Sequence, residues 1–486
     1  MANPITEKDA KPSSRKLRII DHAARLAPAR ASWIARNRFF HDEETRYLRF
    51  LVPPGSKILE LGCGTGDLLA ALEPAHGVGI DISDVAVAEG RRRYPGLDLR
   101  CGDIEDAATL GGVEGPFDFI LLADTIGDLE DVETTLDRLH ALCGPDTRII
   151  LVYHSPFWAP VLKLAEWLGL KMPATEKNWL WPEDMQALLS LADFEPIRSE
   201  LRMLSPRRLL GLGSLVNRFV ATLPAIRRLC LRNYIVAQSL PRRREDPPAS
   251  VSIVIPARNE EGNIAAAIAR MPRFADDMEI LFVEGNSADG TWAEMLRVRD
   301  ANPGWDIKCL RQDGKGKGDA VRKGFAAARG DVLMILDADL TVPPEDLPKF
   351  WRALAKGRGD FINGSRLVYP MQDGAMQALN FMANHAFSII FTYLLNQRFT
   401  DTLCGTKVLR RRHYAAIERN RSYFGDFDPF GDFDLIFGAV KHNLKVVEVP
   451  IRYAARTYGE TQISRFRHGV LLLRMVLFAY RKLKAL

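Results

Sequence analysis

The stretch Glu60-Leu-Gly-Cys-Gly-Thr-Gly66 begins in a short strand-like run, residues 57–61, and opens a helical pattern at residues 67–72. Glycines allow the backbone to turn tightly and to approach a ligand closely. The free amides at a helix N-terminus favour an anionic group at the same place. A strand, a glycine-rich loop and a helix in this order predict an α/β unit whose loop binds a small molecule.

The alternation of strands and helices extends outward from this loop and restarts once along the chain. Alternating strands and helices form parallel sheets that are covered on both faces. The predicted fold class is therefore α/β, with two doubly wound domains. The strand-like runs lie at residues 57–61, 78–81, 117–123 and 148–153, and again at 252–256, 279–283, 307–310 and 332–336.

The two halves are separated by PRRREDPPAS, residues 241–250. Its three prolines and consecutive charges resist regular structure, which is typical of an extended, solvated connector. The predicted organisation is an N-terminal tail (1–29), a first domain (30–240), a linker (241–250), a second domain (251–462) and a basic amphipathic C-terminal helix (463–486).

The overall composition is that of an ordinary globular protein. The chain has 486 residues, of which 47% are hydrophobic and 26% charged, and its formal net charge of +5 does not by itself indicate nucleic acid binding. Its six cysteines are scattered, so we expect reduced thiols and neither a zinc site nor disulfides. The first thirty residues contain no apolar run, and no stretch reaches the ~20 apolar residues of a membrane-spanning helix. We therefore expect a cytoplasmic protein.

Acidic residues end the next two predicted strands. Asp81 closes GVGID, at the spacing at which a carboxylate accepts hydrogen bonds from both hydroxyls of a ribose. Asp103, in CGDIED, ends a third strand beside the expected place of an adenine. Both acids, together with the glycine-rich loop, indicate a nucleoside-containing ligand.

Together with FDFILLADTIGDL, these motifs resemble the class I S-adenosylmethionine-dependent methyltransferases, roughly over residues 30–240. The resemblance implies S-adenosylmethionine as the cofactor, with Asp81 on its ribose and Asp103 facing its adenine. The alternative is a domain that only binds the cofactor or a partner. By the same resemblance, the cofactor-binding residues are Glu60, Gly62, Gly64, Gly66, Asp81 and Asp103.

Three residues near the ends of the fourth and fifth predicted strands are candidates for the acceptor side of this site: Asp124, Tyr153 and His154. An imidazole titrates near neutrality, so His154 could serve as a base for a hydroxyl acceptor. The alternative is a histidine with a purely structural role.

In the second half, a buried-type strand at residues 333–336 ends in Asp337-Ala-Asp339. Two carboxylates one residue apart are costly unless a cation joins them. Mg²⁺ or Mn²⁺, held by carboxylate and diphosphate oxygens, is the natural partner. The pattern predicts a metal site at Asp337 and Asp339.

Seven ordered motifs surround this pair, and they resemble the family 2 glycosyltransferases of GT-A fold, most closely the dolichyl-phosphate mannose type of polyprenyl-phosphate synthase. The resemblance covers residues 251–467 and implies a nucleotide-sugar donor. Asp337 then faces the nucleotide, and Asp339 is the metal ligand. The implied donor-binding residues are Pro256, Arg258 and Glu260 at the nucleobase, Glu284 on the second strand, and Lys317 and Asp319 along the ribose and diphosphate. The motifs are VSIVIPARNEEGNI (251–264), VEGNSADGT (283–291), GKGKGDAVRKGFAAARGD (314–331), DADLTVPPEDL (337–347), NGSRL (363–367), DTLCGTKVLRR (401–411) and GDFDL (431–435).

The acceptor remains open between two chemistries. A lipid phosphate is already anionic and needs cations, for which Arg366 and Arg456 match the family positions. A glycan hydroxyl needs a carboxylate base, and Asp432 or Asp434 would supply it. Residues 461–462 read Thr-Gln where close relatives have Ser-Lys, which favours the hydroxyl, whereas the basic tail favours the lipid. The prediction is a bifunctional enzyme with a lipid-phosphate acceptor.

Two basic amphipathic segments, residues 205–232 and 463–486, have leucines at helical spacing flanked by arginine and lysine. Such helices bind anionic membrane interfaces, although an ordinary helix that covers its own domain has the same pattern. Peripheral contact with the cytosolic membrane face is the favoured interpretation. Nucleic acid is not an expected partner, because the basic residues alternate with leucine and not with stacking aromatics.

Overall fold

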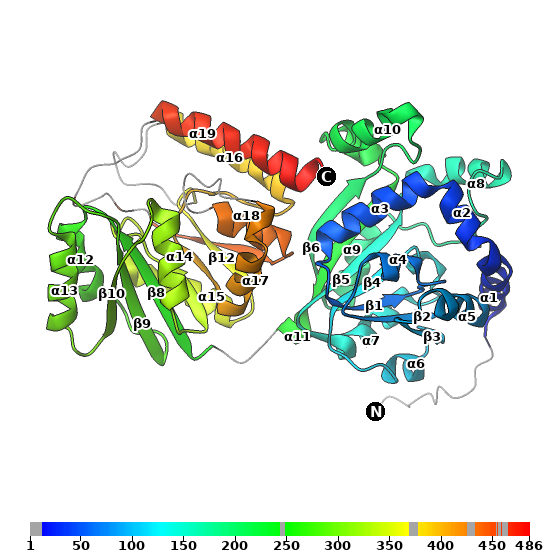
Figure 1. Cartoon of the computed structure of the whole chain (residues 1–486), viewed down its shortest axis with the longest axis horizontal. Coiled ribbons are helices and arrows are strands. Elements are labelled where there is room, and N and C mark those ends of the chain that lie inside the picture. The colour runs from blue at the N-terminus through cyan, green and yellow to red at the C-terminus, as the bar shows by residue number, and fades with distance from the viewer. Residues whose placement is uncertain are drawn as a thin grey trace. The chain divides into compact units, whose positions relative to one another are not determined.

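The computed structural model of the chain describes residues 12–243, 248–368, 378–424, 433–452, 454, 458 and 465–486. The chain forms two compact units, Met1–Arg243 and Arg244–Leu486, each built on its own seven-stranded sheet (Figure 1). The predicted fold class, two doubly wound α/β domains, is confirmed. Regular structure continues into the predicted linker, because helix α11 covers Leu240–Arg243 and strand β8 starts at Ser250.

The sheet of the N-terminal unit has the order β3-β2-β1-β4-β5-β7-β6. Strand β7 runs antiparallel to both of its neighbours, and the other pairs are parallel. The central strands are buried on both faces, which is why β5 reads as the continuous apolar run at residues 149–152. The strands are β1 (Lys57–Leu61), β2 (His76–Asp81), β3 (Asp98–Cys101), β4 (Phe117–Ala123), β5 (Cys143–His154), β6 (Phe194–Arg202) and β7 (Arg232–Ser239).

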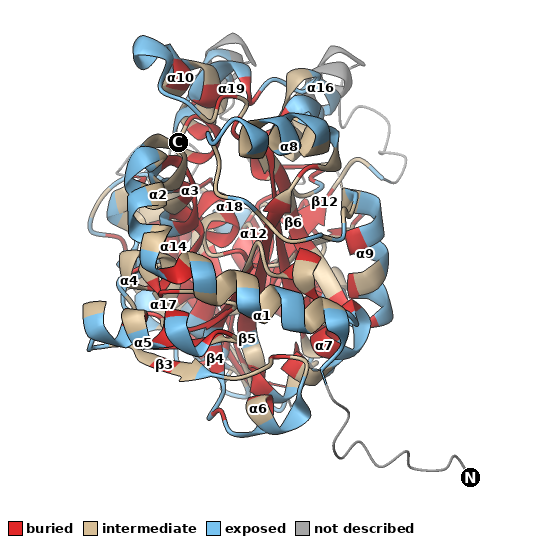
Figure 2. Cartoon of the chain, turned by 90° about the vertical axis from the view of Figure 1, so that its right-hand side faces the viewer, coloured by how far each residue is buried: buried red, intermediate tan, exposed pale blue. Residues whose placement is uncertain are grey.

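Helices cover both faces of this sheet, and their outer sides are exposed while the strands between them are buried (Figure 2). Residues Ser14–Leu26, assigned above to an N-terminal tail, form helix α1, whose first turn is capped by the Ser13 hydroxyl accepting from the Lys16 amide at 3.1 Å. None of its residues is fully buried, and its apolar residues Ile19, Ala23 and Leu26 line a cavity of this unit. The remaining helices are α2 (Arg30–Arg36), α3 (Arg38–Leu51), α4 (Asp67–Ala71), α5 (Asp84–Arg93), α6 (Ala107–Gly111), α7 (Val132–Arg138), α8 (Ala159–Trp167), α9 (Pro182–Leu191), α10 (Leu212–Leu215) and α11.

The sheet of the C-terminal unit has the order β10-β9-β8-β11-β13-β12-β14. Strands β8 to β11 pair in parallel, whereas β13 runs antiparallel to β11 and to β12. The runs predicted from residue 252 onward correspond to the first four of these strands. The strands are β8 (Ser250–Ala257), β9 (Asp277–Glu284), β10 (Asp306–Arg311), β11 (Val332–Ile335), β12 (Phe361–Ser365), β13 (Lys407–Arg410) and β14 (Val446–Pro450).

The predicted C-terminal amphipathic helix is α19 (Arg465–Ala479), followed by a π-helical turn, Tyr480–Lys484. Met475, Ala479 and Leu483 are buried in the unit, so one face of this helix packs as an ordinary core element. Among the described residues, no helix combines the length and the apolar character needed to span a membrane. The other helices of the unit are α12 (Glu261–Ala269), α13 (Thr291–Ala301), α14 (Lys317–Ala327), α15 (Leu347–Ala355), α16 (Ala378–Leu395), α17 (Arg411–Arg419) and α18 (Phe433–Lys441).

Candidate active sites

The glycine-rich loop lies between β1 and α4, and three of its glycines have left-handed backbone angles. The φ values are 76° at Gly62, 56° at Gly64 and 75° at Gly66. A Cβ atom on Gly62 would lie 2.2 Å from the Thr125 hydroxyl oxygen, so this position has no room for a side chain. The loop therefore needs glycine at these positions for its backbone conformation, and for close packing at Gly62.

Asp81 is the last residue of β2 and is hydrogen-bonded to the glycine-rich loop. Its Oδ2 accepts a hydrogen bond from the Gly64 amide at 2.7 Å, and its Oδ1 accepts one from the Ser83 amide at 2.9 Å. Burial raises the pKa of Asp81, although the two amide bonds act in the opposite direction. Each carboxylate oxygen has a second lone pair, so Asp81 can still accept from ligand hydroxyls.

Glu60 lies on β1 beneath the loop and is only 3% exposed. Its Oε2 is buried and has no hydrogen-bond partner among the residues that the structure describes. Burial raises the pKa of Glu60 to about 8, even though the nearby Arg30 guanidinium favours the charged form. The carboxyl is thus largely protonated at neutral pH and is poised to ionise beside a cation.

Asp103 follows β3 and is ion-paired with a residue that the sequence analysis did not identify. The Lys16 ammonium on α1 lies 2.6 Å from Asp103 Oδ2 and 2.9 Å from Glu105 Oε2. Helix α1 therefore covers the site expected to hold an adenine. No motif marks Lys16, since its position depends on how the first helix packs.

A cavity of about 1980 Å³ brings these groups together. Of the six predicted cofactor-binding residues, Gly66 lies behind the loop as the N-cap of α4, and the other five line the cavity. The three acceptor-side candidates, Asp124, Tyr153 and His154, line the same cavity.

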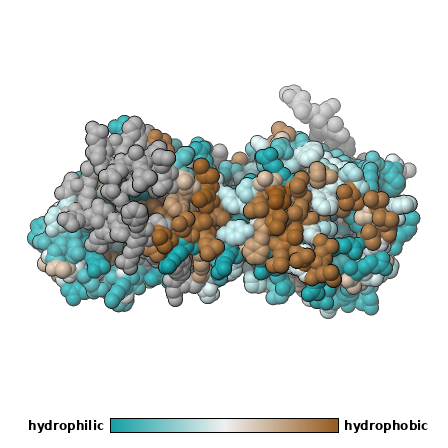
Figure 3. Space-filling model, turned by 90° about the horizontal axis from the view of Figure 1, so that it is seen from above, coloured by the Kyte–Doolittle hydropathy of each residue, from teal (hydrophilic) through white to brown (hydrophobic). Residues whose placement is uncertain are grey.

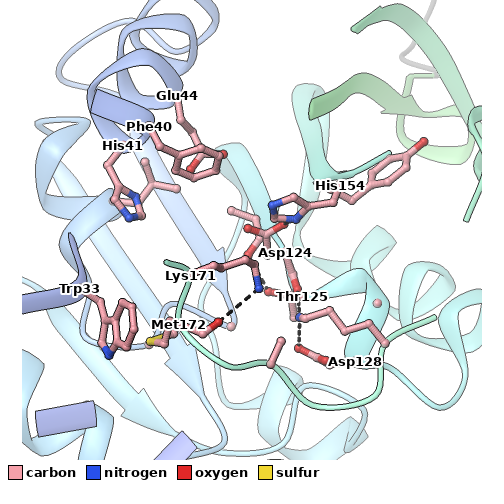
Figure 4. A pocket seen from close by; sticks show the side chains of 18 of the residues that line it. Trp33, Phe40, His41, Glu44, Asp124, Thr125, Asp128, His154, Lys171 and Met172 are labelled. Carbon is pink, nitrogen blue, oxygen red and sulfur yellow. Dashed lines mark hydrogen bonds and ion pairs between the residues drawn. The ribbon is translucent and has the colours of Figure 1, made fainter. Parts of the chain in front are cut away.

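Asp124, just after β4, lies beside His154 at one wall of the cavity (Figure 4) and is the centre of a partly buried charge network. Its Oδ1 lies 2.9 Å from His154 Nδ1 and accepts from the Arg232 guanidinium, whose other terminal nitrogen pairs with Glu44 on α3. The backbone of Asp124 is left-handed, with φ of 60°, a conformation that often marks functional sites. Phe40 stacks parallel to the His154 ring, with ring centroids 6.2 Å apart.

Burial opposes the charge on Asp124, but Arg232 and His154 outweigh it and hold the pKa of this carboxyl well below its usual range. Burial raises the pKa of Glu44 and lowers that of His154. The sequence analysis missed Glu44 and Arg232, because they lie far from Asp124 in the chain and in no motif.

The buried Oε2 of Glu60 predicts that the affinity for S-adenosylmethionine depends on pH. A cationic ammonium, such as the one at the methionine end of S-adenosylmethionine, stabilises the Glu60 carboxylate and releases its proton on binding. Affinity is then expected to rise roughly tenfold per pH unit between about pH 6 and pH 7, and to level off above the carboxyl's own pKa of about 8.

Titration calorimetry in two buffers of different ionisation enthalpy measures both the affinity and the released proton. The matched control is Glu60→Gln, which cannot ionise and should bind with the same affinity at every pH. A wild-type affinity that does not change with pH would contradict this assignment of Glu60.

In the C-terminal unit, Asp337 follows β11 and faces Lys317 at the start of α14, with Nζ 2.7 Å from Asp337 Oδ1. Burial would raise the pKa of Asp337, but Lys317, Lys407 and Arg366 together hold it below its usual value. A Cβ atom on Gly405 would lie 1.8 Å from Asp337 Oδ2, so this glycine is packed directly against the pair. The sequence analysis missed Gly405 and Lys407 as site residues, although both belong to the motif DTLCGTKVLRR.

Asp339 lies two residues further on, at the same edge of the sheet. Its Oδ1 accepts from the Thr341 amide at 3.1 Å and from the Thr341 hydroxyl at 2.8 Å, which fixes the carboxylate. Asp337 and Asp339 are both partly exposed. This donor set of hard carboxylate oxygens at a strand end fits Mg²⁺ or Mn²⁺.

Three of the predicted donor-binding acids order the loops around this edge. Glu260 accepts from the Asn263 side chain at 2.6 Å, Glu284 accepts from the Ser287 amide, and Asp319 accepts from the Gly314 amide at 2.8 Å. Pro256 is the penultimate residue of β8 and is half-buried, and Arg258, two residues later, is exposed. The predicted residues thus lie at the carboxyl ends of β8, β9 and β11 and at the start of α14.

Arg366, predicted to contact an acceptor phosphate, forms a bidentate ion pair with Asp401. Its Nε donates to Asp401 Oδ2 at 2.6 Å, and its Nη2 donates to Asp401 Oδ1 at 2.8 Å. Burial opposes the charge on Asp401, but Arg366 holds its pKa below the usual value. Asp434 pairs with Arg421 at 3.2 Å. The remaining candidates, Asp432 and Arg456, lie outside the described residues.

Comparison with protein families assigns both halves of the chain. Residues 33–199 match the family described as methyltransferase domain, and residues 252–418 match glycosyl transferase family 2. Among solved structures, a possible histamine N-methyltransferase from Thermotoga maritima has a TM-score of 0.34 at 20% identity and covers 39% of this chain and 88% of its own. Glucosyl-3-phosphoglycerate synthase from Mycobacterium tuberculosis has a TM-score of 0.37 at 16% identity and covers 48% of this chain and 80% of its own.

Curated relatives match the C-terminal half. Dolichol-phosphate mannosyltransferase of Pyrococcus furiosus is 30% identical over 44% of this chain and 59% of the relative. The low-salt glycan biosynthesis hexosyltransferase of Haloferax volcanii is 29% identical over 46% of this chain and 52% of the relative. This chain therefore spans less than two thirds of the length of both relatives. Undecaprenyl-phosphate mannosyltransferase of Micrococcus luteus is 28% identical over 44% of this chain and 87% of the relative. The chain therefore joins a methyltransferase domain to a family 2 glycosyltransferase domain.

Proposed function

We propose that the C-terminal unit transfers a sugar from a nucleotide sugar to a polyprenyl phosphate, and that the N-terminal unit methylates a related intermediate with S-adenosylmethionine. The arrangement of Lys317, Asp337 and Asp339 at one edge of the sheet carries the first part of the proposal. The names of relatives that act on dolichol phosphate and undecaprenyl phosphate support the acceptor class.

Within the transferase site, Asp337 and Asp339 would hold Mg²⁺ or Mn²⁺. When bound, such an ion supplies a Lewis acid that offsets charge on the leaving diphosphate. Lys317 adds a positive charge beside Asp337 and keeps this carboxylate ionised. Glu260, Glu284 and Asp319 order the loops that would surround the nucleotide.

The acceptor proposal rests on how the charged groups are paired. A phosphate oxygen is ionised near neutral pH and needs no base, whereas a hydroxyl acceptor needs one. Asp434, one candidate base, is paired with Arg421, and Arg366, one candidate cation, is paired with Asp401. We favour the lipid phosphate, with Arg456 as the cation near it, over a glycan hydroxyl with Asp432 as base. A lipid acceptor also implies peripheral contact with the cytosolic membrane face.

In the methyltransferase cavity, the Asp124–His154 pair supports a hydroxyl acceptor. If Nδ1–H of His154 donates to Asp124, Nε2 carries the lone pair that would accept the hydroxyl proton, in competition with Arg232 Nη1 at 3.4 Å. The lowered pKa keeps the imidazole neutral, which a proton acceptor requires. In the alternative, a domain that binds the cofactor without turnover, this pair has a structural role only.

The proposal is tested by incubating the full chain with a panel of labelled nucleotide sugars, Mn²⁺ and a short-chain polyprenyl phosphate. We expect label in the lipid phase and release of the nucleoside diphosphate. Arg456→Ala should slow the transfer by orders of magnitude and leave donor binding intact, whereas Asp432→Asn should be tolerated. Complete loss of transfer in Asp432→Asn, with donor binding preserved, would indicate a hydroxyl acceptor instead.

A further inference from the structure

The N-terminal unit exposes a concentrated group of large apolar side chains on α8 with its flanking residues, and on the segment that contains α10. Figure 3 shows hydrophobic surface on one face of this unit, and Figure 1 places α8 and α10 on that face. We refer to these residues as the apolar face. They are Phe157, Val161, Leu164, Trp167, Leu168 and Leu170, and Leu209, Leu210, Leu212, Leu215, Phe219, Val220, Leu223 and Leu229.

The extent of exposure within the apolar face is unusual for a protein surface in water. Trp167 is 81% exposed, and Leu210 is as exposed as in an extended peptide, at 105%. The backbone presents Leu210 through left-handed angles at two successive leucines, with φ of 43° at Leu209 and 56° at Leu210. Contiguous exposed apolar surface of this kind marks an interaction site, and the backbone strain that presents it adds to its cost in water.

The two segments of the apolar face are joined to each other and to the cavity. The Trp158 indole N–H, at the start of α8, donates to the Leu229 carbonyl at 2.8 Å. Val161, Leu170 and Leu209 are exposed and also line the methyltransferase cavity. The apolar face therefore continues directly into the wall of this cavity.

The net charge of this face is positive. Residues 203–231 contain five arginines and no aspartate or glutamate. The single acid on α8, Glu166, is neutralised by Lys171 at 2.6 Å. An apolar centre with a basic surround is complementary to the anionic headgroup region of a lipid bilayer, where tryptophan and arginine are also favoured. The five arginines are Arg207, Arg208, Arg218, Arg227 and Arg228.

We propose that the apolar face is the surface by which the methyltransferase unit binds an anionic lipid interface, with Trp167 and Leu210 inserted among the headgroups. Binding in this orientation brings the cavity against the bilayer surface. The segment around α10 was assigned to membrane contact from its sequence, but α8 was not, and the folding of the chain joins the two. This inference holds whichever acceptor the cavity takes.

The test uses the full chain and vesicles of phosphatidylcholine with or without phosphatidylglycerol, in the absence of any substrate. We expect the wild type to sediment with the mixed vesicles, and binding to weaken in high salt. The double variant Trp167→Glu/Leu210→Glu should reduce the vesicle-bound partition coefficient roughly tenfold, because two carboxylates replace the inserted groups. Neither residue lines the cavity, so S-adenosylhomocysteine binding, measured by calorimetry, should be unchanged and reports that the unit is folded.

Leu191→Glu provides the matched control, because Leu191 is 65% exposed at the end of α9 and lies outside the apolar face. It should sediment as the wild type does. Two results would overturn the inference: a wild type that stays in solution with the mixed vesicles, or a double variant that sediments as well as the wild type. Self-association that disappears in the double variant, without vesicle binding, would assign the face to a second copy of the chain. Failure of sugar transfer would leave these outcomes unaffected, since no donor is present.

Discussion

Replacement of Gly405 by alanine is expected to reduce sugar transfer about a hundredfold, because it displaces the charged pair on which the donor site depends. The new methyl group would lie 1.8 Å from Asp337 Oδ2 and 2.5 Å from Lys317 Nζ, both far inside contact distance. Asp337 and Lys317 must then separate, and the carboxylate at the end of β11 leaves its position. The structure predicts this effect although Gly405 itself carries no chemistry.

The measurement is kcat/KM for the nucleotide sugar, with the unfolding temperature recorded in parallel. Gly304→Ala is the matched control, because a Cβ atom there has no neighbour closer than 4.0 Å and should change nothing. A Gly405→Ala enzyme with wild-type kcat/KM would show that the Asp337–Lys317 pair has no part in transfer.

Arg232→Met is expected to destabilise the N-terminal unit by about 3–5 kcal/mol, which makes it the largest stability effect predicted for this chain. Arg232 is fully buried and supplies the positive charge that faces both Asp124 and Glu44. A methionine of similar length fills the space but leaves the buried Glu44 and the partly exposed Asp124 without their cation. Glu44, whose pKa is already raised, should take up a proton to relieve part of the cost.

Denaturant unfolding of the variant and the wild type measures this difference. Glu44→Gln in the Arg232→Met background should restore part of the stability, since only Asp124 then lacks its partner. The control is Arg92→Met, which removes an exposed pair with Glu89 and should cost little. A loss below about 1 kcal/mol in Arg232→Met would mean that the network is not the main source of stability at this wall.

Local patterns predicted the elements of both domains well. The loop from Glu60 to Gly66 and the pair Asp337 and Asp339 each stand beside a strand in the sequence, so short-range spacing was enough to place them. The runs at residues 252–256 and 279–283 lie within β8 and β9. Helix α1 escaped detection because its apolar residues, such as Ile19, Ala23 and Leu26, recur at helical spacing and form no continuous apolar run.

The sequence did not show which charged side chains form ion pairs with each other. Asp401 pairs with Arg366 across 35 positions, and Arg232 pairs with Glu44 across 188. Such pairs depend on which strands become neighbours, and no spacing rule within one segment encodes that. Arg366 therefore appeared in the sequence as an open cation for phosphate, whereas the structure places its guanidinium on a buried carboxylate.

Each sheet contains one reversed strand beside its parallel centre, β7 in the first unit and β13 in the second. A reversed strand begins at the edge where its parallel neighbours end, so its first residue lies at the edge that holds the candidate site. In both units that first residue is a fully buried cation, Arg232 or Lys407. Arg232 lowers the pKa of Asp124, and Lys407 adds to the effect of Lys317 in lowering the pKa of Asp337. The reversed strand of each sheet thus places a buried positive charge near an acid that follows a parallel strand.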